Sequence, residues 1–296
     1  MRVPTPSRPL DHVVLPVVRL STARARLTAL GFTVAPDGAH PFGTANCCVY
    51  LSDGTFLEPL AVADGKATAA SVDAGNVFTA RDADYRRLHG ENGFSALVLG
   101  SDDAERDHGL FRKAGVSAGP MLEFSRPFVD AGGKADIASF RLAFAADKHA
   151  PGVFFFSCHR LNVPAVDRSA LQQHANGALA ISEVLLAAET PKSHAGLLAE
   201  LTGSEVRVLD DGSLAAAAGS SRIVISTPAV LEDAFGIHGG MGATLHATGV
   251  VFATDDLIRL QSLLHASSVE FRRHKGRVIV LPAPGQGAAF IFEEAT

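Results

Sequence analysis

The chain has 296 residues, of which 47% are hydrophobic, and it contains 18 phenylalanines and no tryptophan. A chain of this length has room for two domains of ordinary size. The net charge of −5 and the scattered basic residues disfavour binding to nucleic acid or to an anionic membrane, and no apolar run reaches the length of a membrane-spanning helix.

The first predicted elements form a unit of one strand, one helix and further strands. Leu10 to Leu15 is an apolar strand, and Ser21 to Leu30 has the pattern of a helix that ends at Gly31. Two more strands are predicted, from Thr44 to Leu51 and from Phe56 to Val62. Such a unit cannot bury its apolar face alone and must stack on a neighbour.

The same unit recurs three times along the chain. Its opening strands are predicted at Phe94 to Leu99, Ala178 to Leu186 and Thr248 to Phe252. Its helices are predicted at Ala104 to Ala114, Pro191 to Leu201 and Asp255 to His265. Four stacked βαβββ modules predict an α+β fold. Because the strand pattern lapses between Leu161 and Asn176, we expect an N-terminal unit over residues 8–162 and a C-terminal unit over residues 175–296.

Three short motifs lie on the strands and turns of the first module: Leu10-Asp11-His12-Val13-Val14, Gly43-Thr44-Ala45-Asn46 and Asp53-Gly54-Thr55-Phe56-Leu57-Glu58. They resemble the glyoxalase/bleomycin-resistance/extradiol-dioxygenase superfamily, also called vicinal oxygen chelate. A fourth motif, Phe155-Phe156-Ser157-Cys158-His159 followed by His174-Ala175-Asn176-Gly177-Ala178, is similar to a stretch of the glyoxalase-like domain proteins in that superfamily. The resemblance implies that two modules pair into a cupped half-barrel, so that four modules form two such units.

In that superfamily, metal ligands lie on the first and last strand of each module. The first module holds His12 and Glu58 at these places, and imidazole and carboxylate suit zinc, manganese, nickel or iron(II). The second module holds Ala96 and Phe156 there, so half of the ligand set is missing. Two interpretations stay open: His12 and Glu58 bind a divalent metal, or they form a hydrogen-bonded pair suited to acid–base chemistry.

The C-terminal unit is expected to carry a degenerate site. Glu183 stands in the place of His12, and Ile225 stands near the place of Glu58. Extradiol dioxygenases with four modules carry an iron site of two histidines and one carboxylate in this half, and the matching positions here lack both histidines. The sequence therefore argues against ring-cleaving dioxygenase activity.

Four side chains are predicted to bind substrate in the N-terminal cup: Asn46, Arg126, Arg141 and Phe156. A guanidinium on a middle strand of the second module can hold a carboxylate, an enol or a phosphate through two parallel hydrogen bonds. The alternative for both arginines is a solvated position on the outer face of a half-exposed sheet. Asn46 can hydrogen-bond a ligand or cap a neighbouring loop.

We predict a glyoxalase-like enzyme that acts on a small oxygenated metabolite as a lyase, isomerase or hydrolase through His12 and Glu58. The alternative is a non-catalytic protein that sequesters a small molecule, like the bleomycin-resistance members, and the abundant phenylalanines favour it. The sequence leaves the substrate and the choice between monomer and homodimer open. Three cysteines without a Cys-x-x-Cys pattern, and an N-terminus without the apolar segment of a secretory signal, predict a cytoplasmic protein with reduced thiols.

Overall fold

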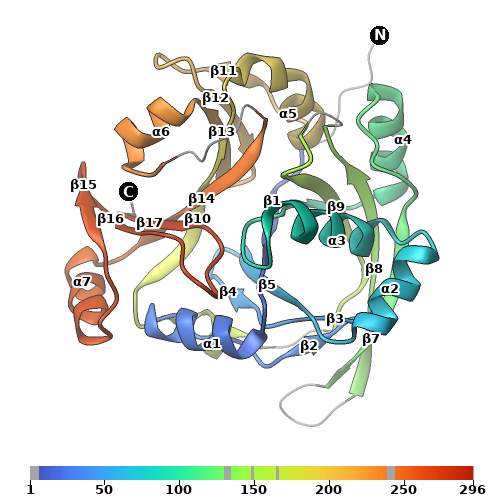
Figure 1. The fold of residues 1–296 in the computed structure, drawn as a ribbon, viewed down its shortest axis with the longest axis horizontal. Helices are drawn as coiled ribbons and strands as arrows, with labels where there is room; N and C mark the ends of the chain where they lie inside the picture. The colour runs from blue at the N-terminus through green and yellow to red at the C-terminus, as the bar shows by residue number, and fades with distance from the viewer. Residues whose placement is uncertain (1–6, 130–134, 148–149, 165–166, 239–243, 296) are drawn as a thin grey trace.

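Each half of the chain forms one sheet, and the two sheets have corresponding strand orders (Figure 1). The structure, a computed structural model, describes residues 7–129, 135–147, 150–164, 167–238 and 244–295. Over these residues it contains one nine-stranded sheet and one eight-stranded sheet, with helices between the strands. The prediction of an α+β fold built on two sheets is confirmed.

The first sheet is formed by two modules with two helices between them. The first module consists of β1 (Leu10–Pro16), α1 (Leu20–Ala29), β2 (Gly38–Ala39), β3 (Thr44–Asn46), β4 (Val49–Tyr50) and β5 (Phe56–Val62). The intervening helices are α2 (Gly65–Asp73) and α3 (Val77–His89). The second module consists of β6 (Ala96–Ser101), α4 (Ala104–Ala114), β7 (Leu122–Val129), β8 (Ala135–Ala145) and β9 (Phe154–Asn162). One predicted strand of the first module is split into β3 and β4, and both pair with β5.

The second sheet repeats this order of elements. A 3₁₀ turn η1 (Ser169–Gln172) lies in the connection between the sheets. The third module consists of β10 (Ala178–Ala187), the 3₁₀ turn η2 (Pro191–His194), α5 (Ala195–Thr202), β11 (Val206–Val208), β12 (Leu214–Ala218) and β13 (Ser221–Ser226). After α6 (Pro228–Phe235), the fourth module consists of β14 (His246–Thr254), α7 (Leu257–Ala266), β15 (Arg272–His274), β16 (Arg277–Val280) and β17 (Ala289–Glu294).

Local signals explain where the helices begin and end. Helix α4 begins after Asp103, whose side chain accepts a hydrogen bond from a backbone N–H of the first turn, and it ends at Gly115, with φ 74°. Helix α6 has the same signals, with Thr227 as its N-cap and Gly236 at φ 65°. The sequence prediction missed α2, α3 and α6 because these helices lie between the modules, outside the repeating pattern.

The strand order brings the first and last strands of two modules to the centre of each sheet. The first sheet has the order β2-β3-β5-β1-β6-β9-β8-β7. In it β1 and β6 are antiparallel, and each is parallel to the last strand of its own module, β5 or β9. The second sheet has the order β11-β12-β13-β10-β14-β17-β16-β15 with the same strand directions. The strands predicted to carry ligands therefore lie side by side.

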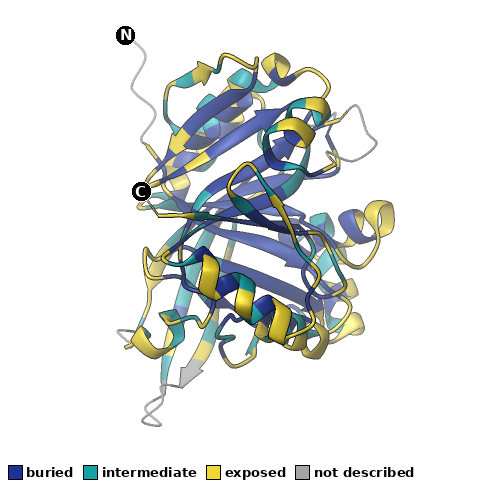
Figure 2. Ribbon diagram, turned by 90° about the vertical axis from the view of Figure 1, so that its left-hand side faces the viewer, coloured by how far each residue is buried: buried dark blue, intermediate teal, exposed yellow. Residues whose placement is uncertain are grey.

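Alternate residues of the central strands face two different cores. Val13, Leu15 and Leu97 belong to the largest core, which also contains side chains from α1, α4, α5, α7 and the second sheet. Val14 and Val98 belong to another core, inside the first half-barrel. Figure 2 shows the buried strands in the middle of the molecule and the exposed residues on helix surfaces and loops. The two units therefore share one hydrophobic core.

The second half-barrel is filled by its own chain. Leu231 and Phe235 of α6, and Ile237 just after it, form a buried cluster with Leu185 and Ile291 of the sheet. Leu185 lies two residues after Glu183 on β10, so it shares the strand face that corresponds to the face of His12 in the first unit. Helix α6 thus covers the inner face of the second sheet, as Figure 1 shows.

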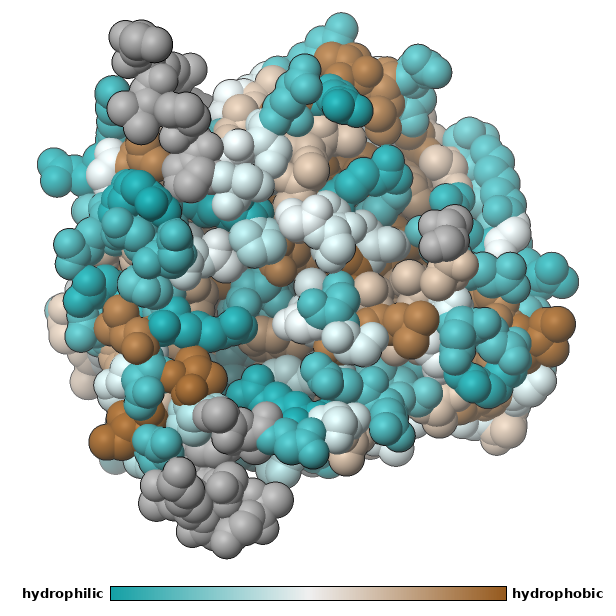
Figure 3. Space-filling model, turned by 180° about the vertical axis from the view of Figure 1, so that it is seen from behind, coloured by the Kyte–Doolittle hydropathy of each residue, from teal (hydrophilic) through white to brown (hydrophobic). Residues whose placement is uncertain are grey.

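Hydrophobic side chains on the surface are scattered among hydrophilic ones, as the rear view in Figure 3 shows. Ile258, on the outer side of α7, is 76% exposed, more than any other large hydrophobic residue that the structure describes. No helix in the described part of the chain combines the length and the apolarity that crossing a membrane requires.

Candidate functional site

Asp11 and His12 both face the cavity of the first half-barrel, although neighbouring residues of a regular strand point to opposite faces. The pairing of β1 with β6 shifts in register between Leu10 and His12, as in a β-bulge. A bulge bends the strand locally and changes the direction of a side chain. This irregularity adds a second carboxylate beside the histidine.

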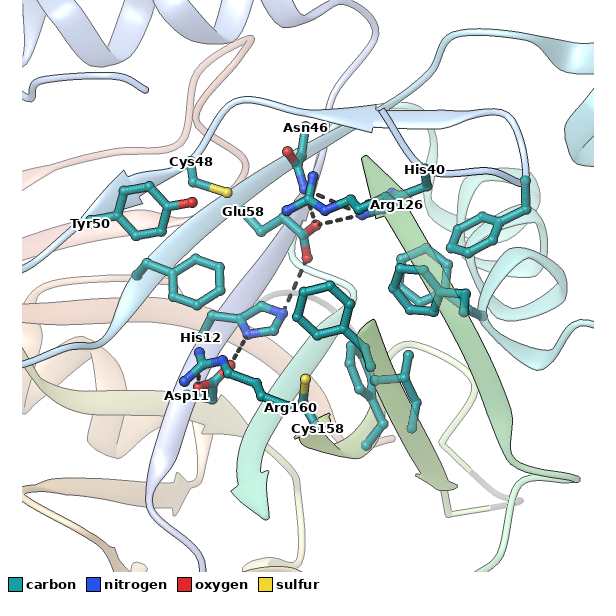
Figure 4. Close-up of a pocket in the computed structure, with 17 residues that line it drawn as sticks. Asp11, His12, His40, Asn46, Cys48, Tyr50, Glu58, Arg126, Cys158 and Arg160 are labelled. Carbon is teal, nitrogen blue, oxygen red and sulfur yellow. Dashed lines mark hydrogen bonds and ion pairs between the residues drawn. The ribbon is translucent and has the colours of Figure 1, made fainter. Parts of the chain in front are cut away.

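Two carboxylates hold the His12 imidazole. Nδ1 lies 2.7 Å from Oδ2 of Asp11, and Nε2 lies 3.2 Å from Oε2 of Glu58 (Figure 4). The ring is stacked on Phe56, with 4.3 Å between the centroids, and it meets the edge of Phe156 at 5.9 Å. Because Asp11 fixes one nitrogen and the two phenylalanines fix the ring, the other nitrogen points at Glu58.

Glu58 is held from its other side by two residues of the β2–β3 hairpin. Nδ2 of Asn46 donates a hydrogen bond of 2.6 Å to Oε1 of Glu58, and Nε2 of His40 lies 3.7 Å from the same oxygen. Nδ1 of His40 is 2.9 Å from the hydroxyl of Thr44. The pairing of β3 with β5 places Asn46 opposite Leu60, two residues beyond Glu58 on the same strand face.

The charges of this cluster follow from burial and from hydrogen bonds. Burial favours the neutral form of His12, but the hydrogen bonds to Asp11 and Glu58 outweigh it and raise the pKa of His12 above 6.5. Burial would raise the pKa of Glu58, but the hydrogen bond and the charge of His12 lower this pKa to about 2. For His40 burial dominates and lowers the pKa to about 4. These shifts favour the charged forms of His12 and Glu58 and the neutral form of His40.

The rest of the cavity is mostly aromatic. Its volume is about 80 Å³. Besides the groups above, the wall is formed by Phe42, Cys48, Tyr50, Phe78, Phe124, Phe140, Leu142 and Cys158. Burial strongly raises the pKa of the Cys48 and Cys158 thiols, which are therefore neutral at physiological pH. A small apolar chamber thus surrounds one polar cluster, which is the usual composition of a small-molecule site.

Two arginines line the cavity beside this cluster. Arg160, on β9, forms an ion pair with Asp11. Arg126, on β7, lies with its guanidinium 5.9 Å from the centre of the Phe140 ring and extends toward Gly38 and Asn46. Figure 4 shows both guanidinium groups near the His12 cluster.

Five of the predicted site residues line this cavity: His12, Asn46, Glu58, Arg126 and Phe156. Arg141 lies elsewhere. Its guanidinium is 2.7 Å from Oε2 of Glu123 and 2.6 Å from Oε1 of Glu105, on the face of β8 that packs toward α4.

The sequence prediction omitted Asp11, His40 and Arg160. Asp11 could not be found from strand alternation, because the bulge breaks that rule. His40 belongs to a hairpin whose position depends on tertiary packing. Arg160 did have a signal, since it lies two and four residues after the cavity residues Cys158 and Phe156 on one strand face.

The donor set does not match a complete metal site. Ala96 and Phe156, at the places of the second module's ligands, are buried and carry no donor atom. In the part of the chain that the structure describes, no three histidine, cysteine, aspartate or glutamate side chains converge in an arrangement that can hold a metal ion. Most divalent metal sites in proteins use three or more protein donors, so metal binding by His12 and Glu58 stays a prediction.

In the second unit, the place of His12 is taken by a charge pair. Glu183 forms an ion pair with Arg222, which is its direct partner in the pairing of β10 with β13. Because α6 covers the inner face of the second sheet and Glu183 is paired with Arg222, the candidate site lies in the first half-barrel.

The sequence and the fold were both similar to known proteins. The family described as glyoxalase-like domain matches residues 10–202. A search of the curated proteins gives no match to this sequence. The matched residues extend from β1 to the end of α5 and contain every residue of the cavity described above.

Three solved structures share the fold over nearly the whole chain. A hypothetical protein from Staphylococcus aureus has a TM-score of 0.65 at 12% identity, and the match covers 97% of this chain and 100% of that one. A mutant of 4-hydroxymandelate synthase from Streptomyces coelicolor has a TM-score of 0.63 at 15% identity, with 97% and 92% covered. A Mn(II)-bound glyoxalase from Novosphingobium aromaticivorans has a TM-score of 0.53 at 13% identity, with 97% and 82% covered.

At these identities the structural likeness shows the fold, and the family match shows the membership. The solved structures include a glyoxalase and a hydroxymandelate synthase, which are members of the vicinal oxygen chelate superfamily. The family match covers about two thirds of the chain, including the complete first half-barrel. The chain therefore belongs to the glyoxalase-like domain family.

Proposed function

We propose that the protein is a glyoxalase-like enzyme that acts on a small oxygenated metabolite in the cavity of the first half-barrel. The observation that carries this proposal is a buried histidine–carboxylate pair in an apolar chamber: Nε2 of His12 lies 3.2 Å from Oε2 of Glu58, and both groups line the cavity. Buried charge pairs add little net stability, because desolvation offsets their attraction. Titratable groups with shifted pKa values inside a cavity are typical of catalytic sites.

The pair supplies a base and an acid to one bound molecule. Glu58 accepts a proton from a carbon next to a carbonyl group, while protonated His12 donates a hydrogen bond or its proton to the carbonyl oxygen. The electron pair of the broken C–H bond stays in the substrate as an enol, so the step needs no oxidant. If the deprotonated carbon carries a hydroxyl group, return of the proton to the former carbonyl carbon and loss of the hydroxyl proton complete an isomerisation. If the next carbon carries a leaving group, the electron pair of the enol expels it with its bonding electrons and completes a lyase reaction.

Asp11 acts on this chemistry through His12. Its carboxylate holds Nδ1 of the imidazole and so keeps Nε2 directed at Glu58 and the cavity. Arg160 pairs with the second oxygen of Asp11, which holds that carboxylate in place. We therefore assign Asp11 and Arg160 as positioning residues in this proposal.

The second candidate function is binding without chemistry, like the bleomycin-resistance proteins of the superfamily. The observation that favours it is the aromatic wall, where Phe42, Phe78, Phe124, Phe140 and Phe156 supply most of the contact surface. A binder of this kind releases the ligand unchanged, and its affinity depends on the wall more than on His12 and Glu58.

Solvent isotope exchange separates the two candidates. The protein is incubated in D₂O with a panel of small α-hydroxy and α-keto compounds, and mass spectrometry detects deuterium incorporated next to the carbonyl group. The enzyme proposal predicts incorporation by the wild-type protein that falls about 100-fold or more in Glu58→Gln. Glu123→Gln, which removes a carboxylate outside the cavity, is the matched control and should exchange like the wild type. Binding of a panel compound with no exchange would favour the binder.

A further inference from the structure

Arg126 is a cavity arginine that forms no ion pair with any aspartate or glutamate of the described residues. The other positive and negative groups of the cavity have partners: Arg160 pairs with Asp11, and Glu58 pairs with His12. Arg126 is half-buried and lies over the Phe140 ring. An arginine in this position has hydrogen-bond donors available to a ligand.

Gly38 makes room for the Arg126 guanidinium. A Cβ atom at residue 38 would overlap Nη1 of Arg126 and would lie 2.7 Å from Oδ1 of Asn46. The φ angle of Gly38 is not in the positive range, so alanine can adopt this backbone conformation. Residue 38 therefore has no side chain because Arg126 and Asn46 occupy the space, and not because the backbone conformation there requires glycine.

We infer that the ligand of the first half-barrel is a small monocarboxylate whose anionic group binds Arg126, an inference that rests on the function proposed above. A guanidinium holds a carboxylate through two parallel hydrogen bonds, which fix both its position and its orientation. A ligand bound in this way points its neighbouring carbon atoms into the chamber, toward His12 and Glu58. The α-carbon and its oxygen substituent then lie where the proposed acid and base act.

Charge and volume narrow the class of ligand. Asp11 and Glu58 are already paired with Arg160 and His12, so the single charge of Arg126 is left for the ligand, which matches a monoanion better than a dianion such as a phosphate monoester. One buried water molecule needs roughly 10 to 15 Å³ of cavity volume measured in this way. The volume of about 80 Å³ therefore suits a ligand with few non-hydrogen atoms.

The test compares carboxylates with their neutral amides. Glycolate, lactate and pyruvate are titrated into ¹⁵N-labelled protein beside glycolamide, lactamide and pyruvamide, and shifts of the backbone N–H signals of the cavity residues report binding in the wild type and in every variant. The Arg126 Nε–H signal, assigned by its loss in Arg126→Gln, reports contact with the guanidinium where Arg126 is present. We expect each acid to bind the wild-type protein at least tenfold more tightly than its amide. Arg126→Gln and Gly38→Ala should each remove this preference, whereas Arg141→Gln, whose guanidinium lies outside the cavity, should keep it.

The outcomes separate this inference from the proposed function. Equal binding of acids and amides at the cavity would overturn the inference and leave the proposed function standing. Failure of both series to bind would contradict both. Gly38→Ala in the Arg126→Gln background should have no further effect on acid binding. A further loss there would show that Gly38 serves Asn46 instead of Arg126, and would overturn its assigned role.

Discussion

Oδ2 of Asp11 lies 2.7 Å from Nδ1 of His12, although the two residues are neighbours on one strand. At the register shift in this part of β1, both side chains face the same cavity. As a consequence, one imidazole contacts two carboxylates, Asp11 at one nitrogen and Glu58 at the other. This contact pattern determines the charge of the site and supports the proposed acid–base chemistry.

Asp11→Asn should destabilise the protein more at pH 6 than at pH 9. His12 has a pKa above its ordinary value in the folded protein, so its stabilising contribution is present below pH 6.5 and is lost as pH rises through the folded pKa. We expect a loss of about 1 to 3 kcal/mol in the free energy of unfolding at pH 6. Chemical denaturation at both pH values measures this, with the surface variant Asp37→Asn as control. An equal loss at both pH values would contradict the raised pKa.

His40→Asn should remove part of the acid sensitivity of the fold. Burial lowers the pKa of His40 to about 4, so below pH 6.5 the unfolded chain takes up a proton that the folded protein does not. Stability therefore falls as pH falls from 6.5 to 4, by on the order of 3 kcal/mol from this residue. Denaturation of both proteins across this pH range measures the effect. An unchanged pH slope in His40→Asn would show that folding does not lower the pKa of His40.

The central part of the fold followed from the sequence because the repeat is regular there. Helix α4 was predicted at residues 104–114, where the structure has it, since Asp103 and Gly115 mark its two ends. Helix α6 has equally clear end signals in Thr227 and Gly236, yet a search for repeats passes over an element that occurs between repeats. The coverage of the second half-barrel by α6 could not be predicted for the same reason.

The site was predictable only where strand alternation holds. His12, Glu58 and Phe156, which were chosen for their positions on first and last strands, line the cavity. Alternation assigned Asp11 to the opposite face, and only the bulge reverses this. Arg126 and Arg141 were both predicted to bind substrate, and the alternative for each, a solvated outer face, depended on which face its strand turns inward. The sequence left that open, and the pairing of Arg141 with Glu123 answers it.

Phe156→Ala should destabilise the protein by about 3 to 5 kcal/mol, because it leaves an empty space in a packed core. Phe156 is 2% exposed and contacts His12, Phe78, Phe144 and Phe154. The same change enlarges the cavity, so larger ligands should bind more tightly relative to small ones. Thermal and chemical unfolding measure the first effect. Val208→Ala, at a residue that is 59% exposed, is the control and should change stability by less than about 0.5 kcal/mol.

Metal content tests the assignment of His12 and Glu58 as ligands. With two donors in the first module and none at Ala96 or Phe156, we expect substoichiometric metal in protein purified without a chelator. Elemental analysis of the wild type, His12→Ala and the surface variant His265→Ala measures this. One equivalent of metal in the wild type and in His265→Ala, but not in His12→Ala, would show that His12 is a ligand and would contradict the mechanism that uses side chains alone.

The most direct test is the protonation state of His12. The ¹⁵N signals of its imidazole, assigned with His12→Asn, are followed by NMR from pH 5 to pH 10. We predict an imidazolium at pH 7, with a pKa above 6.5 that falls in Glu58→Gln as the stabilising charge is removed. A neutral imidazole at pH 7, or a pKa that Glu58→Gln leaves unchanged, would contradict the ion pair on which the proposed function depends.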